Sequence, residues 1–286
     1  MSTTPIEAAL VAPPQHSAAP MPLMTWLRRR QRVFKGLLGL LLFLVAWQLS
    51  VLFIGMSEYF YPSPLRVFWS FVDLLERGIL PVYLVDSLAR YLIAISIGTA
   101  IGIALGLALG LSPLLYRLFG SFVNFLYAIV EGAWIPLFVV WWGYGFKVIL
   151  ILLIYIIVFP VLYNTMLAVR TVPQTYINMA RSLGGGRIQV LTQVILPASL
   201  PGILTGFRVG AGFAFRGLIF AEMLAAKTGI GYLIYEGVST QNTARTVVGM
   251  ICMGLIWLLI DAMYLKPLTS ATVERWGLVV TADKKA

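Results

Sequence analysis

Four charged side chains interrupt the long apolar runs of this 286-residue chain, namely Glu131, Arg208, Arg216 and Glu222. A charge in hydrocarbon is costly, and such groups usually pair with one another or contact a translocated ion or substrate. We therefore take all four as candidate residues of a translocation pathway. Glu131 and Arg216 fall at similar depths and either pair with each other or contact a substrate. Arg208 and Glu222 lie where pairing or capping near a helix end explains them equally well.

The residues that other chemistries need are scarce. His16 is the only histidine and lies in a stretch rich in Pro and Ala, and Cys252 is the only cysteine and lies in an apolar run. A zinc site or a Ser-His pair inside a membrane would need a histidine there. A phosphate-binding loop would need Gly-Lys-Ser or Gly-Lys-Thr, and the sequence has neither. We therefore expect no catalytic residue, no metal site and no cofactor in this chain.

The candidate residues are positioned by apolar segments long enough to cross a membrane. Hydrophobic residues make up 60% of the chain and charged residues 11%, against about 25% charged residues in soluble domains. Runs of about 20 apolar residues match the hydrocarbon thickness, and they must be helical because lipid offers the backbone no hydrogen bonds. The sequence thus predicts an all-α polytopic membrane bundle. Its six expected spans are about Leu37–Gly55, Tyr91–Leu111, Phe122–Trp142, Val148–Ala168, Gly202–Leu224 and Val247–Leu265.

Flanking charges predict the orientation of these spans. The cations before the first span are Arg28, Arg29, Arg30, Arg32 and Lys35. Cations are enriched on the cytoplasmic side of a membrane protein. The segment before the first span and the connections expected on the same side of the membrane carry more cations than the connections expected on the opposite side. We expect cytoplasmic termini, with a disordered tail over residues 1–35, a membrane domain over 36–268 and a second tail over 269–286. We attribute the net charge of +10 to this bias and not to a nucleic-acid-binding surface. Such a surface would gather its cations on one soluble face, whereas these cations are scattered at the ends of the spans.

Two of the spans carry small residues at every fourth position. The sets are Gly98, Gly102, Gly106 and Gly110 in the second span and Gly202, Gly206 and Gly210 in the fifth. Small residues on one helix face let backbones approach closely in a membrane, either within one subunit or between two copies. Pro136 and Pro160 lie inside the third and fourth spans, where each is expected to kink its helix.

The longest connection expected on the cytoplasmic side, Arg170–Leu196, contains a short amphipathic helix. Pro173 suits its first turn, and Tyr176, Met179, Ala180 and Leu183 form one apolar stripe at helical spacing. Gly184, Gly185 and Gly186 stop this helix. Such a helix could lie in the lipid interface, pack on its own bundle or fill a groove of a soluble partner. Physical chemistry alone leaves these three uses open.

This connection resembles a known signature. Asn178-Met-Ala-Arg-Ser-Leu-Gly184 and, nine residues later, Val194-Ile-Leu-Pro197 are similar to the signature loop of ABC importer permeases. Similarity to the nitrate, sulfonate and taurine branch continues in Pro62–Pro64, Ser87–Arg90, Ile135–Leu137, Pro201–Arg208 and Ala221–Leu224. Asn178 and Met179 replace the glutamate and the following alanine of the family pattern. We expect docking to survive these changes, with an effect on the affinity for the ATPase or on the choice of ATPase.

The resemblance implies the type I ABC importer permease fold, with five core helices and one extra N-terminal span. It implies a second permease copy, two cytoplasmic ATP-binding subunits that hold ATP and Mg, and a periplasmic solute-binding protein. It also implies that the signature loop forms a coupling helix against the ATPase. The coupling residues carried over are Tyr176, Asn178, Met179, Ala180, Arg181, Leu183 and Gly184.

The resulting expectation is a permease subunit in a bacterial inner membrane. It would move a small anion, such as a sulfonate, taurine, nitrate or an aromatic carboxylate, into the cytoplasm by alternating access driven by the partner ATPase. The alternative is a secondary transporter or channel that acts without an ATPase. A secondary transporter would usually show two related halves, and the sequence shows no such internal repeat.

Overall fold

The computed structural model describes residues 22–269, and the side chains of residues 34–267 within them. His16 and the tail beyond residue 269 lie outside the described residues. Two units are distinguished, one ending at Gly55 and the other beginning at Met56. The first contains α1 (Pro22–Ile54). This helix begins at Pro22, so residues 22–35, which we expected in a disordered tail, are helical, because Pro suits a first turn and Leu, Met, Arg and Gln favour helix.

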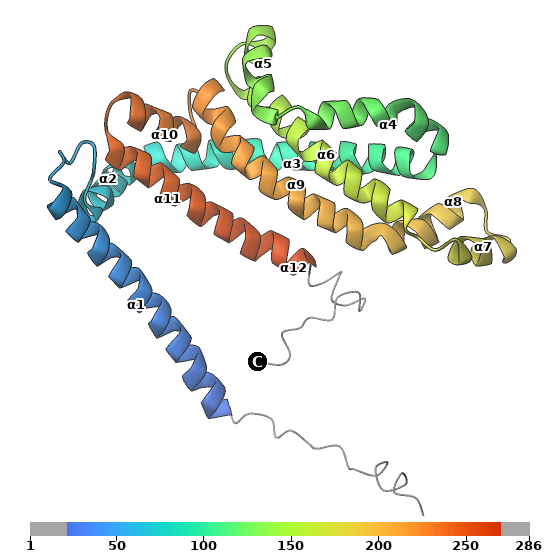
Figure 1. Ribbon diagram of the computed structural model, residues 1–286, viewed down its shortest axis with the longest axis horizontal. Helices are drawn as coiled ribbons and strands as arrows, with labels where there is room; N and C mark the ends of the chain where they lie inside the picture. Colours follow the sequence, from blue (N-terminus) through green and yellow to red (C-terminus); the bar gives the residue numbers. More distant parts are fainter. Residues whose placement is uncertain (1–21, 270–286) are drawn as a thin grey trace, which may run out of the picture. The chain divides into compact units, whose positions relative to one another are not determined.

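The second unit is built from helices joined by short connections (Figure 1). Its elements are α2 (Pro64–Glu76), α3 (Ile79–Leu111), α4 (Pro113–Ala128), η2 (Glu131–Ala133), α5 (Trp134–Trp142), α6 (Phe146–Arg170), α7 (Gln174–Ser182), α8 (Arg187–Val190), η3 (Leu191–Ile195), α9 (Leu196–Ala225), α10 (Ile230–Ser239), α11 (Thr243–Ile260), η4 (Asp261–Leu265) and α12 (Lys266–Thr269). Within this unit, α7 and α8 lie at one end of the α3, α6 and α9 bundle, and α2 and α10 lie at the other.

The centre of the second unit is α6, which packs against both α3 and α9. Small residues make these contacts close. A Cβ added at Gly102 would lie 2.7 Å from Cβ of Val161, and one added at Gly206 would lie 2.7 Å from Cβ of Asn164. Gly98, Gly106 and Gly110 face α6 in the same way from α3, as do Gly202 and Gly210 from α9. The structure therefore places both small-residue faces inside the subunit.

Within residues 22–269, five helical segments are long and apolar enough to cross a membrane. They are Phe34–Ile54, Ile79–Leu111, Phe146–Arg170, Arg187–Ala225 and Thr243–Leu265. A sixth crossing results if α4 and the following η2 and α5 count as one bent span. The predicted all-α membrane bundle is thus confirmed, although the helix of the second span begins at Ile79 and not at Tyr91.

The expected third span, Phe122–Trp142, is broken. Its two halves, Pro113–Ala128 and Glu131–Trp142, meet at an angle of 82°. Ile129 and Val130 are extended at the break, a conformation that β-branched residues favour. The Tyr155 hydroxyl donates a hydrogen bond to the Leu126 carbonyl beside it. The bend therefore precedes Pro136, where we expected a kink, and α6 runs uninterrupted through Pro160.

Candidate coupling helix and membrane-embedded charges

The amphipathic helix expected after Arg170 is α7, and both of its ends are fixed locally. Pro173 occupies the N-cap position, with an extended ψ of 129°. At the other end Gly184 has a φ of +85°, which favours glycine. The Gly184 N–H donates to the Arg181 carbonyl at 3.0 Å, and the Gly185 N–H donates to the Ala180 carbonyl at 2.9 Å. This is the Schellman arrangement that ends a helix and turns the chain.

The apolar residues of α7 face two directions. Ile177 and Ala180 pack against a buried cluster that joins the ends of α6 and α9, formed by Val169, Val172, Val190 and Ile195. Tyr176, Met179 and Leu183 point away from this cluster and are 57%, 58% and 88% exposed. Of the predicted stripe, only Ala180 therefore contacts the bundle.

Two further residues belong to this region and were missed in the sequence. Ile177 lies three residues before Ala180, a helical spacing that could have identified the inward face. Ile188, on α8, is 77% exposed and adds to the apolar surface outside the bundle. Asn178 and Arg181 are exposed on α7, and Oδ1 of Asn178 accepts a hydrogen bond from Nε2 of Gln174 at 3.3 Å. We call Tyr176, Met179, Leu183 and Ile188 the apolar coupling face.

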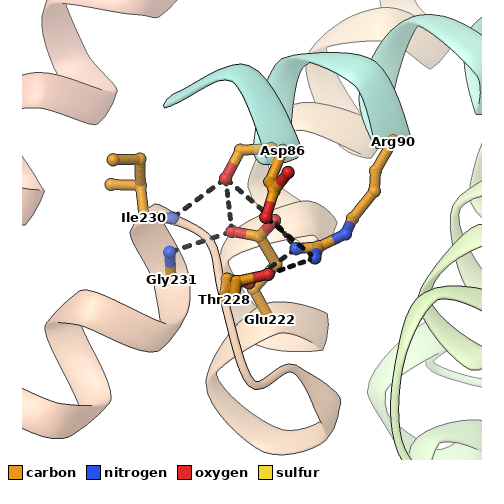
Figure 2. A network of polar contacts seen from close by, with 7 residues as sticks. Asp86, Arg90, Glu222, Thr228, Ile230 and Gly231 are labelled. Atoms are coloured by element: carbon orange, nitrogen blue, oxygen red, sulfur yellow. Dashed lines mark hydrogen bonds and ion pairs between the residues drawn. The ribbon is translucent and has the colours of Figure 1, made fainter. Parts of the chain in front are cut away.

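Glu222 lies at the opposite end of the bundle, in a buried polar network (Figure 2). Arg90 of α3 donates to its Oε1 at 2.7 Å, and the Ser87 hydroxyl lies 2.8 Å from both carboxylate oxygens. The Gly231 N–H donates to its Oε2 at 2.9 Å. Arg90 also donates to the carbonyl and the hydroxyl oxygens of Thr228 at 2.7 and 2.8 Å. These contacts fasten α3, α9 and the α9–α10 turn together.

Backbone geometry completes this network, which we call the buried clamp (Ser87, Arg90, Glu222, Thr228, Ile230 and Gly231). The Ile230 N–H donates to the Ser87 hydroxyl at 2.9 Å. Gly229 has a φ of +120°, and a Cβ there would lie 2.5 Å from Oε1 of Glu222. A Cβ on Gly231 would lie 2.6 Å from Cβ of Glu222. The turn therefore needs glycine at both positions to close over the carboxylate.

The buried clamp bears on the pathway residues proposed from the sequence. Glu222 is 0% exposed, so the structure places it in a structural network, one of the two interpretations left open for it. Ser87 and Arg90 had been noted only for their resemblance to the family, and their link to Glu222 was missed. The sequence feature that could have indicated this link is the pair Gly229 and Gly231, which flanks Ile230 shortly after the fifth span.

Arg208 also has a partner. Its Nη2 lies 3.4 Å from Oδ1 of Asp261, and Nζ of Lys266 lies 3.1 Å from Oδ2 of the same residue. Asp261 begins the π-helical turn η4. We missed Asp261 as a candidate, although it falls inside the sixth span expected from the sequence. The pair joins α9 to the end of α11.

Glu131 and Arg216 remain without a partner among the described residues. Both line a hollow of about 320 Å³ at the bend between α4 and α5, together with Phe213 and Phe220 of α9. No ion pair joins the two charges within the described part of the chain. Of the four candidate pathway residues, Glu131 and Arg216 are therefore the two that have no oppositely charged partner within the described part of the chain.

The sequence of residues 98–265 matches the family model of the binding-protein-dependent transport system inner membrane component. The chain belongs to this family. The taurine transport system permease protein TauC of Escherichia coli is 33% identical over 82% of this chain and 86% of that protein. The putative ABC transporter permease protein MJ0413 of Methanocaldococcus jannaschii is 40% identical, over 49% of this chain and about half, 53%, of its own length.

The fold agrees with this assignment. A chain of the MetNI methionine ABC transporter, in an inward-facing conformation, matches with a TM-score of 0.52 and 20% sequence identity, covering 69% of this chain and 97% of that chain. The predicted type I ABC importer permease fold is thereby confirmed. The family also makes the chain a multi-pass inner-membrane subunit of a transport system that includes a binding protein.

Proposed function

We propose that this chain is the permease subunit of an ATP-driven importer that moves small anions from the periplasm to the cytoplasm. The observation that carries the proposal is the apolar coupling face, which the subunit builds on a rigid support and leaves uncovered. An exposed apolar surface of this kind at the end of the bundle suits a protein partner. That partner would be the cytoplasmic ATP-binding subunit, and the end of the bundle with α7 would face the cytoplasm.

The packing of α7 suggests how movement would reach the membrane. Its inward residues, Ile177 and Ala180, contact the cluster that contains Val169 at the end of α6 and Ile195 just before α9. Well-packed interiors transmit displacement because they are hardly compressible. A shift of α7 imposed by the ATPase would therefore displace α6 and α9 together, and α9 carries Arg216.

The remaining partners follow from the family and from the geometry. Two copies of the permease would enclose the pathway, with α2 and α10 at the end that faces the periplasmic binding protein. Mg and ATP would be held by the ATP-binding subunits. Glu131 and Arg216 are proposed to line the pathway, because an unpartnered charge within the membrane marks a route for ions or substrates. TauC is named for taurine, whose sulfonate group supports a small substrate with an anionic head group.

The coupling proposal is tested with Leu183→Glu in the complete transporter, reconstituted with its ATP-binding subunit and binding protein. Leu183 would be buried against the ATP-binding subunit, so the loss of its apolar side chain and the gain of a charge in that interface should lower ATP-driven uptake about 10- to 100-fold. The ATP-binding subunit should also co-purify less well with the variant.

Gln174→Glu is the matched control, since it adds the same charge near the start of α7, on the side away from the apolar coupling face, where a negative charge is tolerated. Equal uptake by the two variants would contradict docking through the apolar coupling face. Ion-coupled uptake by the purified chain alone would instead support a secondary transporter.

A further inference from the structure

Arg216 separates two hollows of the second unit. One is the hollow shared with Glu131. The other, of about 460 Å³, lies between α9, α10 and α11. Its lining includes Ile219, Met223, Ile234, Met250, Met253 and Trp257, and Arg216 is the one charged residue among the described residues that line it. We call it the methionine hollow.

The guanidinium of Arg216 is available to a ligand. Arg90 and Arg208 both have carboxylate partners, whereas Arg216 has no ion pair or hydrogen bond within the described part of the chain and is exposed. A guanidinium presents a planar fork of donors that matches the oxygens of a carboxylate or of a comparable oxyanion. The free fork at the edge of the methionine hollow therefore suits the head group of an organic anion.

The walls of the methionine hollow suit an apolar tail of variable length. Trp257 is held on one side by Phe215, with ring centroids 5.1 Å apart. Met223, Met250 and Met253 complete the lining, and methionine side chains are flexible enough to repack around ligands of different size. A rigid aromatic wall facing adaptable thioethers can accept several tails while one cation fixes the head group.

A small inorganic anion would gain less from this arrangement. It has no tail to fill the apolar walls, so it would bind through Arg216 alone. The apolar lining therefore favours an anion that carries an apolar tail over a small inorganic anion.

We infer that Arg216 and the methionine hollow bind an organic anion with an apolar tail, such as an alkanesulfonate. The anionic group lies on the guanidinium of Arg216, and the tail lies between α9 and α11. This inference rests on the proposed importer function and names the class of substrate that the pathway accepts.

Methionine methyl groups provide a direct readout. The permease is labelled with [13C-methyl]methionine, assembled with its ATP-binding subunit in nanodiscs and titrated with ethanesulfonate, butanesulfonate or nitrate. The methyl signals of Met223, Met250 and Met253 should shift with the sulfonates and shift much less with nitrate, which has no tail to contact them. Affinity should rise about fourfold per methylene, which is about 16-fold from ethanesulfonate to butanesulfonate. Met263, exposed on η4 outside the methionine hollow, reports any general partitioning into lipid.

Two variants separate the head group from the tail. Arg216→Gln should weaken binding of both sulfonates about 10- to 100-fold, because it removes a charge-assisted hydrogen bond. Gly254 lines the hollow, and a Cβ added there would meet nothing within 4 Å. Gly254→Leu should therefore fill the hollow without disturbing the backbone and abolish the gain from the longer tail. Gly39→Leu, in α1, is the control, since a Cβ at Gly39 also meets nothing within 4 Å.

The outcomes distinguish this inference from the proposed function. Shifts of Met263 equal to those of the other three methionines, a response to nitrate as large as the response to the sulfonates, or unchanged affinity in Arg216→Gln would each overturn the inference. If the complete transporter shows ATP-driven uptake of taurine, ethanesulfonate or nitrate while the three methyl groups do not respond, the inference fails and the proposed function stands. If the methyl groups respond as expected but no ATP-driven uptake occurs, the proposed function fails and the binding site stands.

Discussion

The same helix, α9, carries Glu222 in the buried clamp and Arg216 at the methionine hollow, and the two charges are handled in opposite ways. Glu222 is fully buried and contacts Arg90, Ser87 and a backbone N–H. Arg216, six residues earlier, is exposed and has no described partner. A charge inside an apolar run is therefore not evidence of substrate contact by itself. Whether such a charge can bind a ligand depends on whether the protein already supplies it with a partner. Only a charge without a partner in the protein is free for a ligand.

The largest effect on stability is expected from Glu222→Ala, which would leave Arg90 buried without its closest counter-charge. Asp86 is 3.9 Å from Arg90 and is a weaker substitute. Removing one partner of a buried ion pair costs about 3–5 kcal/mol. Denaturant unfolding of the purified permease measures this loss.

A control for Glu222→Ala is available on α2. Glu76 is exposed, and Glu76→Ala should change stability by less than about 0.5 kcal/mol. The double variant Arg90→Met, Glu222→Leu should regain much of the stability, because it removes both charges together. If Glu222→Ala and Glu76→Ala unfold alike, the buried clamp does not stabilise the fold.

A smaller loss is expected from Gly229→Ala. The substitution forces a Cβ onto a φ of +120° and toward the Glu222 carboxylate, which should cost about 1–3 kcal/mol. Gly254→Ala is the matched control, because its Cβ meets open space in a helix, and it should stabilise by about 0.5–1 kcal/mol. The same unfolding assay should give opposite signs for the two variants, and equal signs would contradict the geometry of the turn.

The smallest stability effect should come from Arg216→Leu, which would sharpen the contrast with the buried clamp. No described ion pair or hydrogen bond is lost, so the free energy of unfolding should change by less than about 0.5 kcal/mol. Uptake by the assembled transporter should nevertheless weaken at least about tenfold. Unchanged affinity and specificity of uptake would contradict a substrate role for Arg216, and a large loss of stability would mean that it has a structural partner.

The sequence predicted those features that depend on periodicity. The spacing of Gly98 through Gly110 identified the face of α3 that meets α6, because a helix repeats every 3.6 residues. The stripe from Tyr176 to Leu183 identified α7, and Gly184 its end. These are local properties, so they can be read without knowing the neighbours.

Features that depend on distant neighbours were missed or left open. Glu222 and Ser87 lie 135 positions apart, and no local pattern indicates that they meet. The break at Ile129 and Val130 falls in an apolar stretch that reads as continuous helix, with neither Pro nor Gly at the bend. Asp261 went unnoticed because its partner Arg208 comes from another helix. In each case tertiary contacts, and not propensity, determine the outcome.

The glycine contacts of α6 limit how this subunit can move. Because neither Gly102 nor Gly206 leaves room for a Cβ against α6, we expect α3, α6 and α9 to be packed too closely to slide past one another. We expect these three helices to move as one rigid body. A displacement imposed at the α7 end would then tilt all three helices and move their opposite ends. Bending would be confined to the neighbouring connections, namely the break at Ile129 and Val130 and the turn with Gly143 and Gly145 before α6.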